Sequence, residues 1–330
     1  MTYTVGSVIL ADDYNTFAGN TTAGLNRVWS TGAGDAGWGQ TDISTVSTSG
    51  QVTATQWATI VNNLATSGTQ TGTTLTSRTA PVTGNIIGIL ANVSTDITSV
   101  TTARGNAIAS GTEYGTFTGS VSKTTGTGSG QAAWTITFTH TITFPSANQA
   151  RYFWNAGGIV RLKYGKSSTG TDADADWNTL AGQCGTINLT GRVGNATQSI
   201  AAQAYTGTTR LSGTGGTQTT LATTTGWYNL TATPATIFQL NDAVSPYSTN
   251  FIRTQATATS TTVLTLATVW SDDGTGTAGA NANITGGTAT TSPSTTITGT
   301  APTVLVTYFP PSSATLSNSW GTPAIAASVA

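Results

Sequence analysis

One alternating run constrains the fold of this chain more than any other feature. From Trp134 to Phe144, every second position holds a large apolar residue or His140, and threonine fills the positions between them. Successive side chains of a β-strand point to opposite faces of its sheet. The run therefore predicts a strand with one buried and one hydroxylated face. His140 falls on the buried face, where we expect a core or interface histidine.

Further runs of β-forming residues predict five more strands, at 159–164, 186–190, 226–231, 262–268 and 303–309. Loops rich in glycine, threonine and serine separate them, at 124–130, 207–220 and 274–292. Many short strands with such turns are typical of a β-sandwich or jelly-roll-like fold.

The first 110 residues follow a different, helical pattern. Asp12 or Asp13 can cap a first helix, and a glycine-rich turn follows at 31–40. Thr53 with Gln56 three residues later forms a capping-box pattern ahead of a helix with one apolar face. We therefore predict a mainly β protein in three parts: a helical or mixed docking region at 1–110, a β-sandwich at 111–205, and a β-rich region with long loops at 206–330.

The most periodic helical segment lies between residues 85 and 109. Apolar residues alternate there at spacings of four and three, as in a heptad seam: Ile86, Leu90, Val93, Ile97 and Val100. One interpretation is an amphipathic helix packed on its own domain. The other is a self-associating helix of a homo-oligomer, with a trimer as the first expectation. Two heptads do not separate these interpretations.

Charged residues are scarce, which excludes several classes of function. The 330 residues include 11 Lys and Arg and 12 Asp and Glu, with a net charge of −1, whereas an ordinary domain carries about 25% of such residues. No basic surface for nucleic acid is expected. Near-zero net charge favours association. We expect a protein that builds by assembly and is not an enzyme.

No motif in the chain predicts a catalytic, cofactor or metal site. His140 is the only histidine and Cys184 the only cysteine, so neither a disulfide nor a zinc cluster can form within one chain. Asp172, Asp174 and Asp176 resemble the start of a calcium loop, but an EF-hand needs a glycine where Trp177 stands. We expect a solvated turn before a short helix at 177–180, with a looser calcium site as the alternative.

The chain also lacks signals for export or membrane insertion. Its first residues have neither the basic nor the apolar part of a signal peptide, and no apolar stretch approaches the length of a membrane span. We expect synthesis in a cytosol and no membrane insertion.

A dense group of aromatic and basic residues occupies 151–161. Their pattern predicts a strand, an Asn-Ala-Gly-Gly turn and a second strand, with Arg151 and Arg161 as hydrogen-bonding or stacking partners. The group comprises Arg151, Tyr152, Phe153, Trp154, Asn155, Gly157, Gly158 and Arg161. This stretch resembles an ARYFFNxGGxIR motif of virion structural proteins of tailed bacteriophages, notably cyanophages and other marine phages. The runs at 5–15, 34–40, 52–57 and 176–187 are similar to that group as well.

The resemblance implies a part of a phage particle and carries no catalytic residues. We expect a tail or neck fibre or appendage that assembles with itself and with other virion proteins. A capsid decoration protein is the first alternative. A carbohydrate-binding or depolymerising protein that contacts host-surface glycan is the second, with Trp227, Tyr228 and Tyr247 as aromatic platforms.

Overall fold

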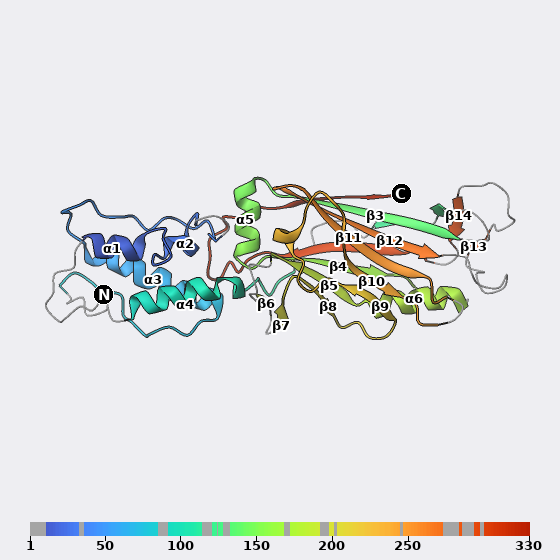
Figure 1. The fold of residues 1–330 in the computed structure, drawn as a ribbon, viewed down its shortest axis with the longest axis horizontal. Coiled ribbons are helices and arrows are strands. Elements are labelled where there is room, and N and C mark those ends of the chain that lie inside the picture. The colour runs from blue at the N-terminus through green and yellow to red at the C-terminus, as the bar shows by residue number, and fades with distance from the viewer. Residues whose placement is uncertain are drawn as a thin grey trace.

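The computed structural model shows an elongated molecule with a helical part at one end and a β part at the other (Figure 1). The structure describes residues 11–32, 36–84, 92–113, 121–123, 125–127, 133–167, 172–191, 198–200, 203–244, 247–272, 284–285, 294–297 and 300–330.

Four α-helices build the helical part. They are α1 (Ala11–Ala18), α2 (Asn26–Trp29), α3 (Ala54–Thr71) and α4 (Val93–Ala103), and the 3₁₀ helix η1 (Arg104–Asn106) follows them. The predicted capping box is confirmed, because Thr53 accepts a hydrogen bond from the Gln56 amide while the Gln56 side chain bonds Thr53. The fully buried Trp57 of α3 packs against Tyr14 and Phe17 of α1. The helices thus enclose an aromatic core of their own.

Two antiparallel sheets build the β part. The first has the order β1 (Val121–Ser122), β15 (Thr303–Phe309), β4 (Ile159–Gly165), β5 (Thr186–Thr190), β8 (Thr208–Leu211). The second has the order β13 (Ile284–Thr285), β14 (Ser294–Ile297), β2 (Thr125–Thr127), β3 (Trp134–Thr143), β12 (Val263–Asp272), β11 (Phe251–Ser260), β10 (Ala235–Asn241), β9 (Thr217–Leu221), and β16 (Ala324–Val329) also pairs with β3. The remaining elements are α5 (Ala147–Asn155), α6 (Asp172–Cys184), η2 (Trp227–Asn229) and the hairpin of β6 (Gln198–Ile200) and β7 (Gln203–Tyr205).

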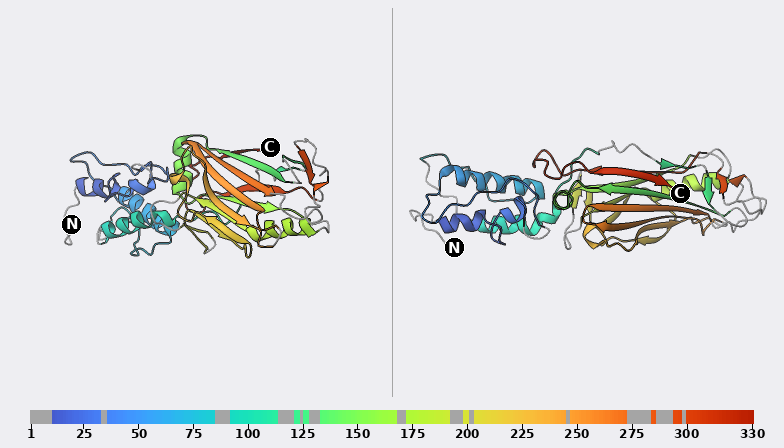
Figure 2. Two further views of the ribbon diagram at one scale, coloured as in Figure 1. Left: turned by 45° about the vertical axis from the view of Figure 1, so that its right-hand side comes forward. Right: turned by 90° about the horizontal axis from the view of Figure 1, so that it is seen from above.

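The two sheets face each other across a shared core, as the views in Figure 2 show. Tyr164 of β4 stacks on Phe238 of β10, and its hydroxyl lies 2.8 Å from the hydroxyl of Thr254 on β11. Burial raises the pKa of the Tyr164 phenol, so this buried polar contact stays neutral. The predicted class, mainly β with a small helical N-terminal region, is confirmed.

The boundary predicted at residue 205 does not divide the β part. β12 pairs along the whole of β3, and β15 lies between β1 and β4. Residues 111–205 and 206–330 therefore contribute strands to the same two sheets and build one sandwich. Local composition cannot reveal such pairing between strands far apart in sequence.

Several predicted elements are confirmed and others are wrong. The strands predicted at 134–144, 159–164, 186–190, 262–268 and 303–309 correspond to β3, β4, β5, β12 and β15, and His140 is buried in the core. The strand predicted at 226–231 is the single turn η2, and the predicted loop at 207–220 holds β8 and most of β9. Most of the loop predicted at 274–292 lies outside the described residues.

Two helices replace predicted irregular or extended segments. Residues 151–155 form the second half of α5, which begins where the Ser146 side chain caps the helix by accepting from the Gln149 amide. α6 begins at Asp172, so the three aspartates lie in its first turns and not in a calcium loop. Acidic residues are favourable at a helix N-terminus.

The apolar row of α4 faces the interior of the chain. Val93, Ile97 and Val100 are fully buried in the common core, whereas Ile86 and Leu90 lie outside the described residues. The three buried residues are therefore not exposed for a seam with another copy, and the seam hypothesis is wrong for them. None of the helices in the described ranges has the length and apolar character needed to span a membrane.

Candidate functional site

Two of the segments that carry the phage resemblance, Gly37–Gln40 and Asn155–Gly158, meet where the helical part joins the sandwich. α5 lies across this boundary in Figures 1 and 2. We call this region the joint and define it by four segments: Gly37–Gln40, Gln70, Asn155–Gly158 and Ser317–Ser319.

Asn155 connects its own turn with the segment Gly37–Gln40 and with Tyr228 of η2. Its side-chain amide donates to the Gly37 carbonyl at 3.0 Å, and its backbone carbonyl accepts from the Trp38 indole at 3.1 Å. Its side-chain oxygen accepts from the Tyr228 hydroxyl at 2.7 Å. Asn155 and Trp38 are both buried. Because a buried polar group without a partner costs about 1–3 kcal/mol, this network specifies how the two parts of the molecule dock.

Two glutamines form further hydrogen bonds across the same boundary. Gln40 donates to the Ser317 carbonyl at 2.9 Å and accepts from the Ser317 amide at 2.8 Å. Gln70 of α3 donates to the carbonyls of Ile108 and Ala156, at 2.8 and 2.9 Å, and accepts from the Thr315 hydroxyl. The helical part is thus held both by the turn after α5 and by the segment that precedes β16.

Two glycines of the joint have backbones that a side chain does not fit. Gly157 has a φ of +103°, and a Cβ there would lie 2.4 Å from the Ala107 carbonyl oxygen. Gly39 has a φ of +71°, and its Cβ would lie 2.3 Å from the Tyr152 ring. Positive φ values favour glycine. These positions bring the backbone of one part directly against the other.

An aromatic group, which we call the joint cluster, fills the sandwich side of the joint. Its members are Phe144, Phe153, Trp154, Trp227 and Tyr308, with neighbouring ring centroids 4.9–5.9 Å apart. Trp154 and Trp227 are stacked, and all five residues are buried. Aromatic pairs in such contact add about 0.5–1.5 kcal/mol each beyond area burial.

The two arginines of the motif make the predicted stacking and polar contacts. The Arg151 guanidinium lies 5.0 Å from the centre of the Tyr152 ring, and that of Arg161 lies 4.3 Å from the Phe309 ring. Arg161 also donates to Asn188 at 2.8 Å. Their roles are structural contacts on the surfaces of α5 and β4.

Arg161 belongs to a small charged group on the outer face of the first sheet. Glu113 accepts from Lys163 at 2.8 Å and from the Thr307 hydroxyl, and it pairs with Arg161 at 3.5 Å. Burial works to raise the pKa of the Glu113 carboxyl, but the Lys163 and Thr307 hydrogen bonds and the positive charge of Arg161 outweigh it and lower that pKa. The group therefore consists of one carboxylate, that of Glu113, which lies between two cations, Arg161 and Lys163.

The side-chain groups that join the two parts are neutral. They are amides, hydroxyls and an indole, which bond one another or backbone groups. Within the described ranges, no three His, Cys, Asp or Glu residues gather to hold a metal ion. Cys184 is buried, and burial raises the pKa of its thiol, so it stays protonated and unreactive at neutral pH.

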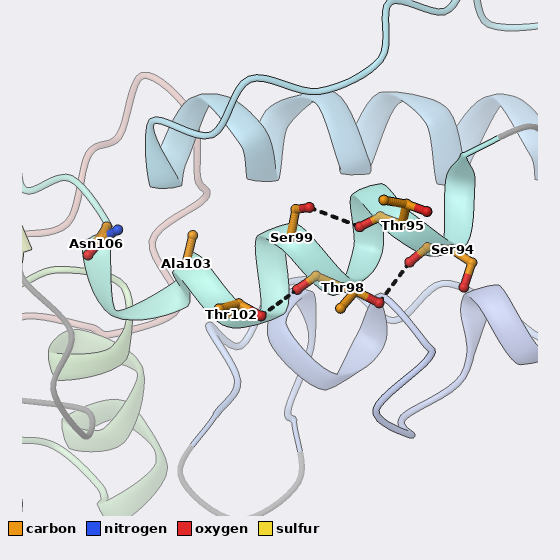
Figure 3. A pocket seen from close by; sticks show the side chains of 7 residues that line it. All are labelled: Ser94, Thr95, Thr98, Ser99, Thr102, Ala103 and Asn106. Carbon is orange, nitrogen blue, oxygen red and sulfur yellow. Dashed lines mark hydrogen bonds between the residues drawn. The ribbon is translucent and has the colours of Figure 1, made fainter.

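The exposed face of α4 lines a shallow groove of about 530 Å³ (Figure 3). Its hydroxyl-bearing residues are Ser94, Thr95, Thr98, Ser99 and Thr102. Three of these hydroxyls donate to carbonyls one turn earlier in the helix, at 2.9–3.0 Å. Because the hydrogens of these three hydroxyls are used within the helix, their oxygens face solvent as hydrogen-bond acceptors. None of the residues that line the groove is charged.

Two of the three aromatic platforms predicted for sugar binding are buried. Trp227 stacks on Trp154, and Tyr247 is buried. Tyr228 is half-buried and donates to Asn155. These three residues therefore make contacts within the molecule.

Sequence reasoning identified the motif residues but assigned no role to Gln40 or Gln70. Gln40 lies in the run 34–40 that carries part of the resemblance, which was the one available signal. Gln70 stands on an otherwise ordinary helix, and nothing in its local sequence marks it.

The chain was also compared with known proteins. No protein-family model, no curated protein and no solved structure matches it.

Proposed function

We propose that this protein is a structural component of a bacteriophage virion, a fibre or appendage of the tail or neck that acts by assembly. The observation that carries the proposal is the joint: Asn155 and Gly157 of the phage-like motif, with Trp38 of the similar run at 34–40, build a buried, uncharged connection between the helical part and the sandwich. A motif used in this way favours a mechanical role over a catalytic one.

The scarcity of charged residues supports the same role. The described ion pairs involve Arg78 with Asp96 and Glu113 with Arg161 and Lys163. Packed aromatics and neutral hydrogen bonds supply many of the other described contacts. Such interactions are little affected by ionic strength, which suits a particle exposed to varying media. The helical part then docks on the particle, and the sandwich faces neighbouring subunits or the host.

The test is to locate the protein in purified particles. Antibodies against the recombinant chain are applied to gradient-purified phage and to the non-particulate fraction of the same lysate, and bound antibody is located by electron microscopy. We expect label at the tail or neck. Label over the head lattice favours the capsid decoration alternative, and its absence from particles overturns the proposal.

A second assay separates assembly from action on glycan. Purified protein is incubated with host polysaccharide, and reducing ends and bound glycan are measured. We expect neither release nor retention. Retention that is lost on changing Thr98 to Val would instead assign glycan binding to the groove along α4.

A further inference from the structure

Within the described residues, β16 is an edge strand of the second sheet. It pairs with β3 from Ala324 opposite Thr143 to Val329 opposite Phe138, without a register shift. Ala324, Ala326, Ala327 and Ser328 are exposed. Among the described strands, β3 is the only one with which β16 pairs. β1 passes near β16 but is hydrogen-bonded to β15.

The ladder fixes which backbone groups of β16 face outward. Ala330 and Thr137 exchange both backbone hydrogen bonds, at 2.9 and 3.0 Å. In an antiparallel ladder such pairs alternate along the strand, so Ser328, Ala326 and Ala324 also bond toward β3. The amides and carbonyls of Ile325, Ala327 and Val329 therefore point away from the sheet.

Within the described residues, β16 itself lacks most of the features that usually block strand addition. Natural edge strands are protected by lysine, proline, bulges or a covering element. β16 has no charge, no proline and no bulge, and no Asp, Glu, Lys or Arg occurs between Asp273 and Ala330. At the opposite edge, by contrast, the pairing of β9 with β10 contains a register shift.

We propose that β16 is a self-association surface, on which the β16 strand of a second copy of this chain adds antiparallel about a two-fold axis at Ala327. The proposal rests on the assembly role proposed above and names the partner. The second sheet then continues across two copies, with the helical parts at opposite ends.

The strand is complementary to itself in this register. Ile325 lies opposite Val329 of the second copy, and Ala326 lies opposite Ser328. Ile325 and Val329 pack against the core of their own sandwich, so apolar side chains meet on the inner face and small ones on the outer face. A two-fold interface uses the same patch on both subunits. With a net charge of −1 per chain, the two copies hardly repel each other.

The first test uses proline at the centre of the edge. Because the Ala327 amide points outward, Ala327→Pro removes a donor to the second copy and leaves the ladder with β3 intact. In sedimentation velocity across a concentration series, we expect wild type to form a dimer and the variant to weaken it by at least about tenfold. Ala327→Lys keeps the amide but sets like charges opposite each other, and we expect the same loss.

The second test traps the pair. Ala327→Cys brings two thiols together at the axis, where Cα atoms of a hydrogen-bonded antiparallel pair lie about 5.5 Å apart, within disulfide range. The native Cys184 is buried and does not compete. The matched control is Thr219→Cys on the exposed edge strand β9. We expect a disulfide-linked dimer for the first variant only.

Each outcome bears on the proposal. It is overturned if wild type stays monomeric, if Ala327→Pro and Ala327→Lys leave the dimer unchanged, or if wild type is a trimer that neither variant affects. Circular dichroism checks that the variants are folded. A dimer in solution with no label on particles would leave the edge pairing standing and refute the virion role, so the two proposals fail separately.

Discussion

The sandwich holds two aromatic clusters that are built on different principles. The joint cluster borders the Asn155 network, in which buried amide, indole and phenol groups all find partners. The other, which we call the distal cluster, consists of Trp134, Trp177 and Trp270, with ring centroids 5.0 and 5.6 Å apart. The indole nitrogens of these three tryptophans are buried without a hydrogen-bond partner in the described structure.

The two clusters differ in what their contacts determine: packing determines stability, whereas directional hydrogen bonds also determine how the two parts of the molecule are oriented. Packing alone, as in the distal cluster, stabilises a sandwich but tolerates small shifts, because dispersion contacts have little directionality. The joint adds directional hydrogen bonds between the helical part and the sandwich, which fixes one arrangement. An elongated molecule of two parts needs such bonds where those parts meet.

The largest expected effect comes from emptying each cluster in turn. Trp154→Ala and Trp270→Ala each remove a fully buried indole, so each should lower the free energy of unfolding by about 3–5 kcal/mol. The comparison predicts different patterns in calorimetry. Trp154→Ala should split unfolding into two transitions by uncoupling the helical part, whereas Trp270→Ala should lower the sandwich transition. Identical patterns would show that the joint cluster does not couple the parts.

A glycine pair tests the close approach across the joint. Gly39 and Gly72 both have positive φ values, but a Cβ at Gly72 has no atom within 4 Å, whereas one at Gly39 meets the Tyr152 ring. Gly72→Ala should therefore cost about 1–2 kcal/mol from backbone strain alone. Gly39→Ala should cost about 1–3 kcal/mol more through overpacking. Urea denaturation measures both, and equal losses would mean that Tyr152 moves aside freely.

Replacing one indole in each region isolates the hydrogen bond. Trp38→Phe removes the donor to the buried Asn155 carbonyl, whereas Trp177→Phe removes an indole N–H that has no partner in the described structure. Both variants lose similar apolar area. We expect Trp38→Phe to be the more destabilising by about 1–2 kcal/mol, the cost of an unsatisfied buried acceptor. The reverse order in chemical denaturation would place the specificity of the joint elsewhere.

Local patterns predicted those elements whose signals lie within a few residues. The capping box at Thr53 and the alternation of β3 were both readable. α5 was not, because the aromatic residues at 152–154 favour a strand by propensity, while the Ser146 cap and packing against the joint decide for a helix. β11 was missed because small and polar residues, Thr254 and Ala256, occupy inward positions. In β10 a register shift between Thr236 and Phe238 interrupts the alternation.

The contacts of the joint could be predicted from the sequence even less well than these elements. The residues of the motif were visible, but their partners lie far away in sequence: Asn155 contacts residues 117 and 118 positions distant, and Gln40 contacts one at 277. Similar long-range pairing made residues 111–330 one sandwich. A single sequence carries no local record of such contacts, since they arise only when separate elements pack.

The smallest expected effect is a difference in the acid sensitivity of stability between the joint and the charged group at Glu113. The polar joint groups Asn155, Gln40 and Gln70 do not titrate, so acid should leave their contacts intact. The lowered pKa of Glu113 means that its ion pairs stabilise the fold above the ordinary value of 4.5 and that this contribution is lost as pH falls through the lowered value. Glu113→Gln should therefore reduce stability at pH 7 slightly and flatten its decline below about pH 4.5, in melting curves recorded from pH 7 to 3. A matched control, Asn155→Asp, places a carboxyl group beside the Gly37 carbonyl in the buried joint, and it should destabilise the fold more at pH 7, where the group is driven to ionise, than at pH 3. If Glu113→Gln and wild type lose stability in parallel on acidification, the carboxylate contributes no acid-sensitive stability on the sheet.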